Sequence, residues 1–300
     1  MLLGDSFALR ELRARIAKLA PLPTPVLLLG ETGTGKTLAA RELHRLSKRS
    51  AQAFAVLDCG ALAPSLAEAE MFGAERGAYT GADARRVGAF ERAGRGTLFL
   101  DEVGELPREL QPRLLRALGE RRFARLGGGE VLAFEARVVA ATNVALRDAA
   151  LRGEFRADLF HRLAVVTLTL PPLRERADDL PLLIAAGLAR AARACALPAP
   201  SFDASFAAAL SDYDWPGNVR ELENALERIV ALGAPPRLGA SEANTLLADL
   251  HADLAAPPAR CAETLQATRS NVAASARALG LPRTTYRRRL ARERALAARD

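Results

Sequence analysis

A glycine-rich segment near the N-terminus has the residue types and the spacing of a phosphate-binding loop. It matches the pattern G-x-x-x-x-G-K-[ST]. Its residues are Gly30, Glu31, Thr32, Gly33, Thr34, Gly35, Lys36 and Thr37. Glycines let the backbone approach phosphate, backbone amides supply positive charge, and the lysine reaches the terminal phosphates. A purely structural glycine turn would not need the Lys36-Thr37 pair, so the segment predicts a nucleoside triphosphate site.

Two adjacent carboxylates supply the other groups that hydrolysis requires. Asp101 and Glu102 directly follow the apolar run Thr97–Leu100. Asp101 is expected to hold Mg²⁺ together with the Thr37 hydroxyl, and Glu102 to polarise an attacking water as a general base. Adjacent acids after a strand are a weak indication alone. Together with the phosphate loop they predict that the triphosphate is hydrolysed.

These side chains need a scaffold that brings them together, and the hydrophobic pattern indicates a parallel sheet. Between Pro25 and about Leu170, short apolar runs alternate with helical patterns, which is typical of strands covered by helices. We expect strands buried on both faces at Val26–Leu29, Phe54–Leu57, Thr97–Leu100, Arg137–Ala141 and Val165–Leu170.

The domain plan follows from changes in this pattern. Residues 1–170 are expected to form the α/β nucleotide-binding subdomain, which ends at Pro171-Pro172. Helical spacing over residues 171–234 predicts a helical lid, with breaks at Leu197–Pro200 and at Trp215–Gly217. The Ala-, Pro- and Gly-rich segment 235–258 is interpreted as a linker. Residues 259–300 form a separate basic module.

Composition excludes several classes of protein. The chain has 300 residues, of which 50% are hydrophobic and 26% charged, so disorder of the whole chain is excluded. No apolar run is long enough to cross a bilayer, and the charged N-terminus does not resemble a secretion signal. A cytoplasmic location is therefore expected. The three cysteines lie far apart and are interpreted as reduced thiols.

The net charge of +7 is concentrated at the C-terminal end. Residues 259–300 contain ten arginines and three acidic residues, and the remaining basic and acidic residues are equal in number. The module is thus expected to meet a polyanion such as DNA. From charge alone, a solvated arginine-rich tail is an equally good interpretation.

The apolar spacing of this module predicts a helix-turn-helix. Asn271–Leu279 has an apolar face, Gly280-Leu281-Pro282 breaks it, and a second helix begins near Arg283. Side chains expected to reach base edges are Arg283, Thr284, Thr285 and Arg288. Those expected to contact phosphates are Arg287, Arg289 and Arg292.

The segment Glu70–Ala82 carries a resemblance to a known family. It reads EMFGAERGAYTGA and is similar to the ELFGHERGAFTGA loop of the sigma-54-dependent bacterial enhancer-binding proteins, the NtrC family of AAA+ transcription activators. The resemblance implies an α/β AAA+ P-loop NTPase with a parallel sheet, a helical lid and a small all-α helix-turn-helix domain of the Fis type. It also implies contact with sigma-54 through Gly77, Ala78, Tyr79, Thr80, Gly81 and Ala82, with Tyr79 in place of the usual Phe.

Four more residues take expected roles from this resemblance. Asn143 ends a strand similar to sensor I and would sense the terminal phosphate of ATP. Arg156 and Arg162 resemble arginine fingers that act on ATP in the neighbouring subunit, which implies a homo-oligomer between a dimer and a hexameric ring. Arg220 resembles the sensor II arginine and would reach ATP from the lid.

One residue departs from the family pattern at a position that matters for regulation. Asp58 stands where the family usually has Asn before Cys59. An asparagine there would hydrogen-bond the catalytic glutamate, whereas Asp58 is expected to repel Glu102. Coupling between hydrolysis and the state of the Tyr79 loop is therefore expected to differ.

Together these features predict an ATP-driven activator that binds enhancer DNA and remodels sigma-54 RNA polymerase. Because the family resemblance begins near Leu3, we expect no N-terminal regulatory domain and regulation by a protein in trans or by expression level. One alternative is a regulator at sigma-70 promoters, or a repressor, that uses its ATPase only for assembly. Another is a protein remodeller that does not bind DNA, against which the basic module argues.

Overall fold

The computed structural model describes residues 2–62, 66–79 and 83–255, and the single residues 272, 275 and 290. The helix-turn-helix expected over residues 259–300 thus lies outside the described residues, apart from three positions. The chain divides into two compact units. Of the described residues, those up to 183 and those at 215–221 form the first unit, and those at 184–214 and from 222 onward form the second.

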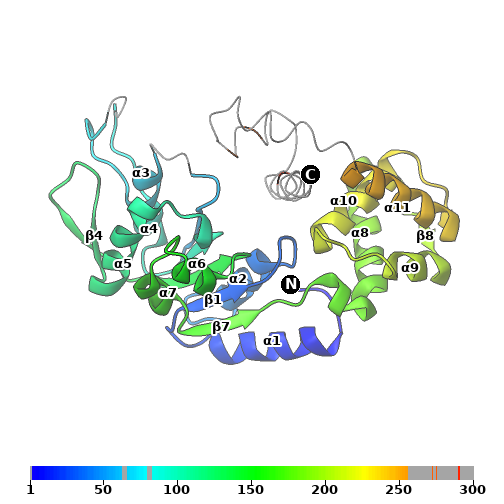
Figure 1. Cartoon of the computed structure of the whole chain (residues 1–300), viewed down its shortest axis with the longest axis horizontal. Helices are drawn as coiled ribbons and strands as arrows, with labels where there is room; N and C mark the ends of the chain where they lie inside the picture. Colours follow the sequence, from blue (N-terminus) through cyan, green and yellow to red (C-terminus); the bar gives the residue numbers. More distant parts are fainter. Residues whose placement is uncertain are drawn as a thin grey trace, which may run out of the picture. The chain divides into compact units, whose positions relative to one another are not determined.

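A five-stranded parallel sheet forms the centre of the first unit (Figure 1). The strand order is β2-β3-β6-β1-β7. The strands are β1 (Val26–Leu29), β2 (Phe54–Asp58), β3 (Thr97–Asp101), β6 (Arg137–Thr142) and β7 (Val166–Thr169). The predicted parallel sheet is confirmed, and the predicted strands match the observed ones to within one residue at each end.

Burial on both faces holds only for the inner strands. Nearly all residues of β1, β3 and β6 are buried. In β2, buried and exposed residues alternate, and in β7 only Leu168 is buried. The expectation of full burial was wrong for β2 and β7 because they are the two edges of the sheet, where the covering helix layers end.

Helices cover both faces of the sheet, and successive strand residues point to opposite layers. Leu98 and Leu100 pack into one core and Phe99 into the other. The layer around Phe99 contains α1 (Phe7–Leu19) and α2 (Lys36–Arg45). The opposite layer contains α3 (Ala67–Phe72), α4 (Ala89–Ala93), α5 (Gln111–Glu120), α6 (Leu146–Leu151) and α7 (Ala157–Leu163).

Several short elements join these layers, and the sequence pattern did not predict them. An antiparallel hairpin consists of β4 (Arg122–Ala124) and β5 (Val131–Ala133). The 3-10 helices are η1 (Val103–Glu105), η2 (Arg108–Leu110), η3 (Leu173–Glu175) and η4 (Ala177–Asp179). Their length of three residues gives too little periodicity for detection from sequence.

The second unit is helical, as the spacing predicted. Its helices are α8 (Leu180–Cys195), α9 (Ala204–Ser211), α10 (Asn218–Ala231) and α11 (Ala240–Ala255), of which α8 and α10 begin in the first unit. A short parallel pair, β8 (Ser201–Phe202) and β9 (Arg237–Leu238), ties two of the connections together. In the described part of the chain, no helix is long and apolar enough to span a membrane.

The interpretation of residues 235–258 as a linker was wrong for most of the segment. Helix α11 occupies Ala240–Ala255 and packs against α9. Ala243, Leu246 and Leu250 are buried, at spacings of three and four residues that place them on one helix face. Alanine contributes little hydrophobicity, so a face built partly from alanine gave a weak periodic pattern.

Candidate functional site

The carboxyl ends of three neighbouring strands gather the predicted chemical groups at one edge of the sheet. The phosphate loop follows β1, and Asn143 follows β6. Asp101 is the last residue of β3, and Glu102 comes directly after it. Because β3, β6 and β1 are adjacent and parallel, these segments emerge side by side. Open α/β sheets bind ligands at this edge.

The phosphate loop has the backbone conformation that its glycines permit. Gly33 and Gly35 have φ of 82° and 103°, in the left-handed region that favours glycine. Gly35 is the N-cap of α2, so the unpaired amides of that helix begin at the loop. The Thr34 hydroxyl donates to the Glu31 carbonyl at 2.8 Å and closes the turn.

The Lys36 side chain lies over this loop and is only 6% exposed. Its Nζ donates to the carbonyl oxygens of Gly30 at 2.9 Å and Glu31 at 3.3 Å. The same Nζ lies 3.3 Å from Glu102 Oε1. A buried ammonium needs such acceptors, and phosphate oxygens of a bound nucleotide could replace them.

The acidic pair is fixed by hydrogen bonds to its surroundings. Thr37 Oγ1 donates to Asp101 Oδ2 at 3.1 Å, and the Glu102 amide donates to Asp101 Oδ1 at 3.1 Å. Glu102 has φ 48° and ψ 48°, a left-handed conformation that is costly for a residue with a side chain. The backbone amide of Asn143 donates to Glu102 Oε2 at 3.2 Å, and its side-chain Nδ2 donates to Thr32 Oγ1 at 3.1 Å.

Burial shifts the protonation of both acids in the same direction. Desolvation raises the pKa of Glu102, and the nearby Lys36 ammonium partly opposes this rise. Desolvation also raises the pKa of Asp101, opposed by the Thr37 hydrogen bond and by Lys36. A raised pKa makes a carboxylate a stronger base, which suits the removal of a proton from water.

The oxygen donors at this site fit a magnesium ion. Thr37 Oγ1 and Asp101 Oδ2 are already within hydrogen-bonding distance of each other. Hydroxyl and carboxylate oxygens, completed by phosphate oxygens and water, are the ligands that Mg²⁺ prefers. Thr37 and Asp101 are therefore the residues that would hold the ion.

Asp58 was expected to repel Glu102, and the structure places its charge beside a different acid. Its Oδ1 accepts a hydrogen bond from the Gly60 amide at 3.0 Å. Its charge contributes to the raised pKa of Asp101, whereas the carboxylate that raises the pKa of Glu102 is Asp101. The repulsion expected between Asp58 and Glu102 is thus directed at Asp101 instead, because Asp58 and Asp101 are paired residues on neighbouring strands.

A polar cluster that the sequence did not reveal joins the phosphate loop to the start of α10. The Arg174 guanidinium binds Glu31 through two bonds of 2.7 and 2.9 Å, and the Arg174 hydrogen bond lowers the pKa of Glu31. Asn218 is fully buried and donates through Nδ2 to Glu31 Oε2 and to the Thr32 carbonyl, each at 3.1 Å. Its Oδ1 accepts from the Leu173 amide at 2.7 Å.

The sequence indicated Asn218 only by its place after Gly217 at a helix start and within the segment that resembles the sensor II signature. Its φ of 54° is one that asparagine tolerates better than most residues. Arg220 follows it on the same helix and is exposed. The Arg220 Cβ lies 3.1 Å from the position that a Cβ on Gly33 would occupy, so Arg220 is adjacent to the phosphate loop.

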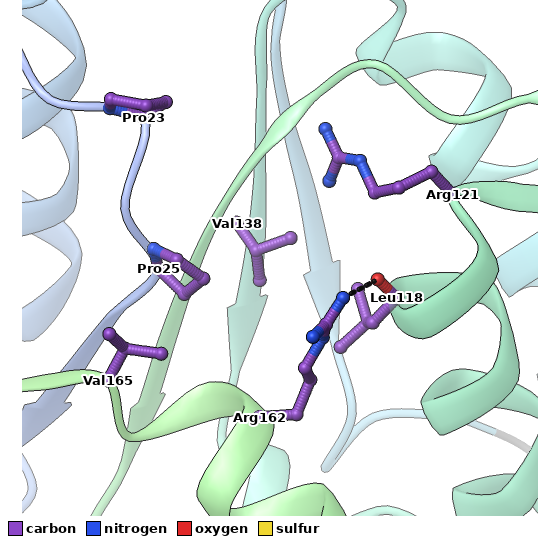
Figure 2. Close-up of a pocket in the computed structure, with 7 residues that line it drawn as sticks. All are labelled: Pro23, Pro25, Leu118, Arg121, Val138, Arg162 and Val165. Carbon is purple, nitrogen blue, oxygen red and sulfur yellow. Dashed lines mark hydrogen bonds between the residues drawn. The ribbon is translucent and has the colours of Figure 1, made fainter.

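The two predicted finger arginines lie on and beside α7 and are exposed. Arg156 forms a two-bond ion pair with Asp158 at 2.8 and 3.0 Å. Arg162 donates to the carbonyl oxygen of Leu118 at 2.9 Å (Figure 2). It also donates to the carbonyl oxygen of Gly119 at 3.4 Å. Within the described residues, neither guanidinium is hydrogen-bonded to the phosphate loop of its own chain.

A buried glutamine connects the acidic pair's turn to the segment of Arg156. Gln111 is 1% exposed. Its Nε2 donates to the carbonyls of Leu106 at 3.2 Å and Glu154 at 3.3 Å, and its Oε1 accepts from the Arg156 amide at 2.9 Å. Because these partners come from two segments that are distant from each other in sequence, no motif in the sequence identified this residue.

The stem of the Tyr79 loop is closed by backbone pairing and by one arginine. The backbones of Ala74 and Arg86 exchange hydrogen bonds of 2.8 and 2.9 Å. Arg125 is 4% exposed and binds three carboxylates, at distances of 2.8 to 3.0 Å. These carboxylates are Glu75 in the stem, Glu91 in α4 and Glu130 beside the hairpin.

Beyond this stem, the described part of the loop ends at Tyr79. Gly77 has φ 79°, and a Cβ placed on it would meet no described atom within 4 Å, while Ala78 and Tyr79 are half-buried. Thr80, Gly81 and Ala82 lie outside the described residues. The predicted DNA-contacting residues also lie outside them, namely Arg283, Thr284, Thr285, Arg287, Arg288, Arg289 and Arg292.

The fold and this site define the class as a P-loop ATPase of the AAA+ type with a helical lid. Residues 2–169 match the family model of the sigma-54 interaction domain, and residues 174–256 match that of the AAA+ ATPase lid domain. The chain belongs to the sigma-54 interaction family. The lid match extends over α11, in agreement with the helix found there.

Related proteins are bacterial regulators. The chain is 44% identical over 296 residues to the C4-dicarboxylate transport transcriptional regulatory protein DctD of Pseudomonas aeruginosa, covering 96% of this chain and 63% of DctD. It is 46% identical over 231 residues to the formate hydrogenlyase transcriptional activator FhlA of Escherichia coli, covering 77% of this chain and 33% of FhlA. The chain thus spans only part of these relatives.

Solved structures show the same fold. The structure of NtrX from Brucella abortus in complex with ATP has a TM-score of 0.75 and 31% identity. The match covers 97% of this chain and 69% of that chain. The complex with ADP gives the same TM-score at 29% identity.

Proposed function

We propose that this protein is a cytoplasmic, ATP-driven transcription activator that remodels sigma-54 RNA polymerase and drives open-complex formation. The observation that carries the proposal is the nucleotide site. A buried Lys36, the Thr37–Asp101 pair and a strained Glu102 converge in a chain whose residues 2–169 match the sigma-54 interaction domain. A damaged phosphate site would have favoured a regulator that does not need hydrolysis.

The residues of the site divide the work of hydrolysis. The loop amides from Gly30 to Gly35 and the N-terminus of α2 bind the phosphates, and Lys36 exchanges its carbonyl partners for phosphate oxygens. Glu102 accepts a proton from the attacking water, and Asn143 holds Glu102 through its backbone amide. Mg²⁺, held by Thr37 and Asp101, would neutralise phosphate charge. Arg220 lies beside the loop and contacts the nucleotide.

Hydrolysis is completed by a neighbouring subunit. Arg156 and Arg162 are exposed, and their hydrogen bonds to other described residues all lie outside the phosphate loop of their own chain. As arginine fingers they would stabilise negative charge on the phosphates of the adjacent protomer, in an oligomer between a dimer and a hexamer. Specific ATPase activity should then rise with protein concentration.

The Tyr79 loop is the part that engages polymerase. Its stem is fixed by Arg125, whereas Gly77 gives the backbone freedom beyond the stem. Residues 77–82 form the contact with sigma-54, and Tyr79 and Thr80 supply side chains for it. Residues 259–300 bind enhancer DNA, and their removal should abolish this binding while ATPase activity persists. Salt should weaken the binding steeply because arginines release counterions from phosphates.

The decisive experiment measures open-complex formation by purified sigma-54 polymerase on a pre-bound promoter with ATP. Thr80→Ala should retain ATP hydrolysis and DNA binding but fail to form open complexes. Tyr79→Phe, which keeps the ring, is the matched control and should remain active.

Full activity of Thr80→Ala would contradict the sigma-54 proposal. The same result with altered transcription from a sigma-70 promoter would indicate the alternative regulator, in which ATP hydrolysis serves assembly. A partner that controls the ATPase in trans would be sought once Thr80→Ala has been found to hydrolyse ATP without forming open complexes.

A further inference from the structure

A cavity of about 270 Å³ lies at the amino ends of the central strands, away from the edge that holds the phosphate loop. Pro25, Val138 and Val165 line it at the starts of β1, β6 and β7, and Leu118 lines it from α5. Its charged side chains are Arg121 and Arg162. Figure 2 shows both of them extending from opposite elements toward the same space.

Arg121 occupies a backbone position that favours glycine. It directly follows the last residue of α5 and has φ 56° and ψ 33°. This left-handed conformation is the usual end of an α-helix, and glycine adopts it without the steric cost that a Cβ brings. Local backbone preference therefore does not explain an arginine at this position. The explanation must come from the interactions of its side chain.

The two guanidiniums have acceptors but no acidic partner. Arg121 donates to the Ala136 carbonyl at 3.1 Å and lies 4.9 Å from the centre of the Phe134 ring. Arg162 donates to the carbonyls of Leu118 and Gly119. Among the described residues, neither forms a salt bridge with a carboxylate, and both remain exposed.

The surroundings add positive charge. Partial burial lowers the pKa of Arg121, and the charges of Arg49 and Arg162 lower it further, against a smaller opposing effect of Glu135. Arg49 itself is bound to three backbone carbonyls at residues 95, 96 and 135. The repulsion between like charges around an open cavity is lowered most when an anion enters the cavity.

We propose that Arg121 is a third cation in trans besides Arg156 and Arg162, so that the terminal phosphates of ATP bound to the adjacent protomer lie between the Arg121 and Arg162 guanidiniums. This inference rests on the proposed trans action of Arg162. In the reaction, water attacks the γ-phosphorus, Glu102 takes a proton, and the bond to the bridging oxygen breaks. ADP and inorganic phosphate are the products. The negative charge that develops on the phosphate oxygens is stabilised by Arg121 and Arg162 together with Arg156.

The test exploits the left-handed backbone. Arg121→Gly removes the guanidinium and leaves the residue best suited to φ 56°, so the thermal midpoint should stay the same or rise. In the assembled protein, kcat should fall at least about tenfold, with nucleotide affinity unchanged. Arg122→Ala, which removes the neighbouring exposed positive charge, is the control and should keep the parental kcat.

Mixing variants decides whether Arg121 acts in trans. Lys36→Ala subunits cannot use nucleotide but still present Arg121. When they are added in excess to Arg121→Gly subunits, activity per Arg121→Gly site should rise several-fold. A second readout is assembly with ADP and aluminium fluoride, a mimic of the transferred phosphoryl group. By analytical ultracentrifugation, Arg121→Gly should form fewer oligomers than the parent under these conditions.

Three results would overturn the inference. A parental kcat for Arg121→Gly would show that Arg121 takes no part in hydrolysis. A low kcat that Lys36→Ala subunits do not restore would place its effect within its own subunit. If Arg121→Gly assembles as fully as the parent with ADP and aluminium fluoride, Arg121 does not contact the phosphates. Arg162→Ala in the same mixing assay separates the two proposals, because failure to restore that variant would reject the trans fingers themselves.

Discussion

The side-chain oxygen of Gln111 accepts a hydrogen bond from the backbone amide of Arg156 at 2.9 Å. Through its amide nitrogen the same residue binds the Leu106 carbonyl in the turn that follows Glu102. One buried amide group therefore joins the turn after Glu102, the proposed general base, to the segment of Arg156, a proposed finger arginine. A displacement of the turn at Leu106 should therefore also displace the segment at Arg156, because a buried polar group must keep its hydrogen-bond partners.

Gln111→Ala should reduce both stability and hydrolysis. The substitution leaves the Leu106 and Glu154 carbonyls and the Arg156 amide without their partner, at a cost of about 1 to 3 kcal/mol in the free energy of unfolding. Urea titration measures that cost. In assembled protein, kcat should fall more than nucleotide affinity, because the phosphate loop is untouched. An unchanged kcat would show that Arg156 does not depend on this contact.

Lys36→Ala and Glu102→Gln should fail at different steps. Lys36→Ala removes the only ammonium over the phosphate loop within the described residues, so binding of a fluorescent ATP analogue should be lost. Glu102→Gln keeps the size and the acceptor for the Asn143 amide, so nucleotide should bind normally. Its kcat should fall by about 10²- to 10⁴-fold, as expected for the loss of a general base. Turnover at the parental rate in both variants would move the catalytic site elsewhere.

The pH dependence of hydrolysis should report the raised pKa of Glu102. The base works only when deprotonated, and burial raises its pKa above the ordinary value of 4.5. Activity should therefore be lost, as pH falls, at a higher pH than an ordinary glutamate would give. In the nucleotide complex, Lys36 binds phosphate instead of Glu102, and the phosphates add negative charge, so the pKa of Glu102 should rise further. The acid limb of kcat should therefore lie at a higher pH than that of kcat/KM.

The measurement for this prediction uses saturating magnesium, so that the nucleotide stays complexed across the pH range. Glu102→Gln serves as the control and should lack the limb. An acid limb at or below the ordinary glutamate value would contradict the assignment of Glu102 as the base.

Asn218→Gly should separate the backbone role of Asn218 from its hydrogen bonds. Glycine accepts the φ of 54° but removes the amide that joins Glu31, Thr32 and Leu173. We expect a loss of about 1 to 3 kcal/mol in the free energy of unfolding and weaker ATP binding, because the phosphate loop loses a buried support. Calorimetry of unfolding and of ATP binding tests both effects. Unchanged values would mean that Arg174 alone holds Glu31.

A comparison of sequences identifies Asp58 as a departure from the family pattern but does not show which residue its charge acts on. Its effect falls on Asp101 because β2 and β3 are adjacent and in register, with Asp58 paired to Asp101. A charge pattern read along one strand cannot reveal which residue on the next strand it opposes. Register is set by packing of the sheet against both helix layers.

The sequence by itself determined the phosphate loop, the acidic pair, the five parallel strands and the helical lid. These features are local, since each depends on residue types at short, fixed spacing and on the hydrophobic period of one segment. The tertiary structure alone decided that β2 and β7 are edges and that residues 240–255 form a packed helix. It also decided that Gln111, Asn218, Arg174 and Arg125 each bind groups distant in sequence. Such contacts depend on strand order and on which buried polar groups need partners, and neither is encoded in the spacing of a single segment.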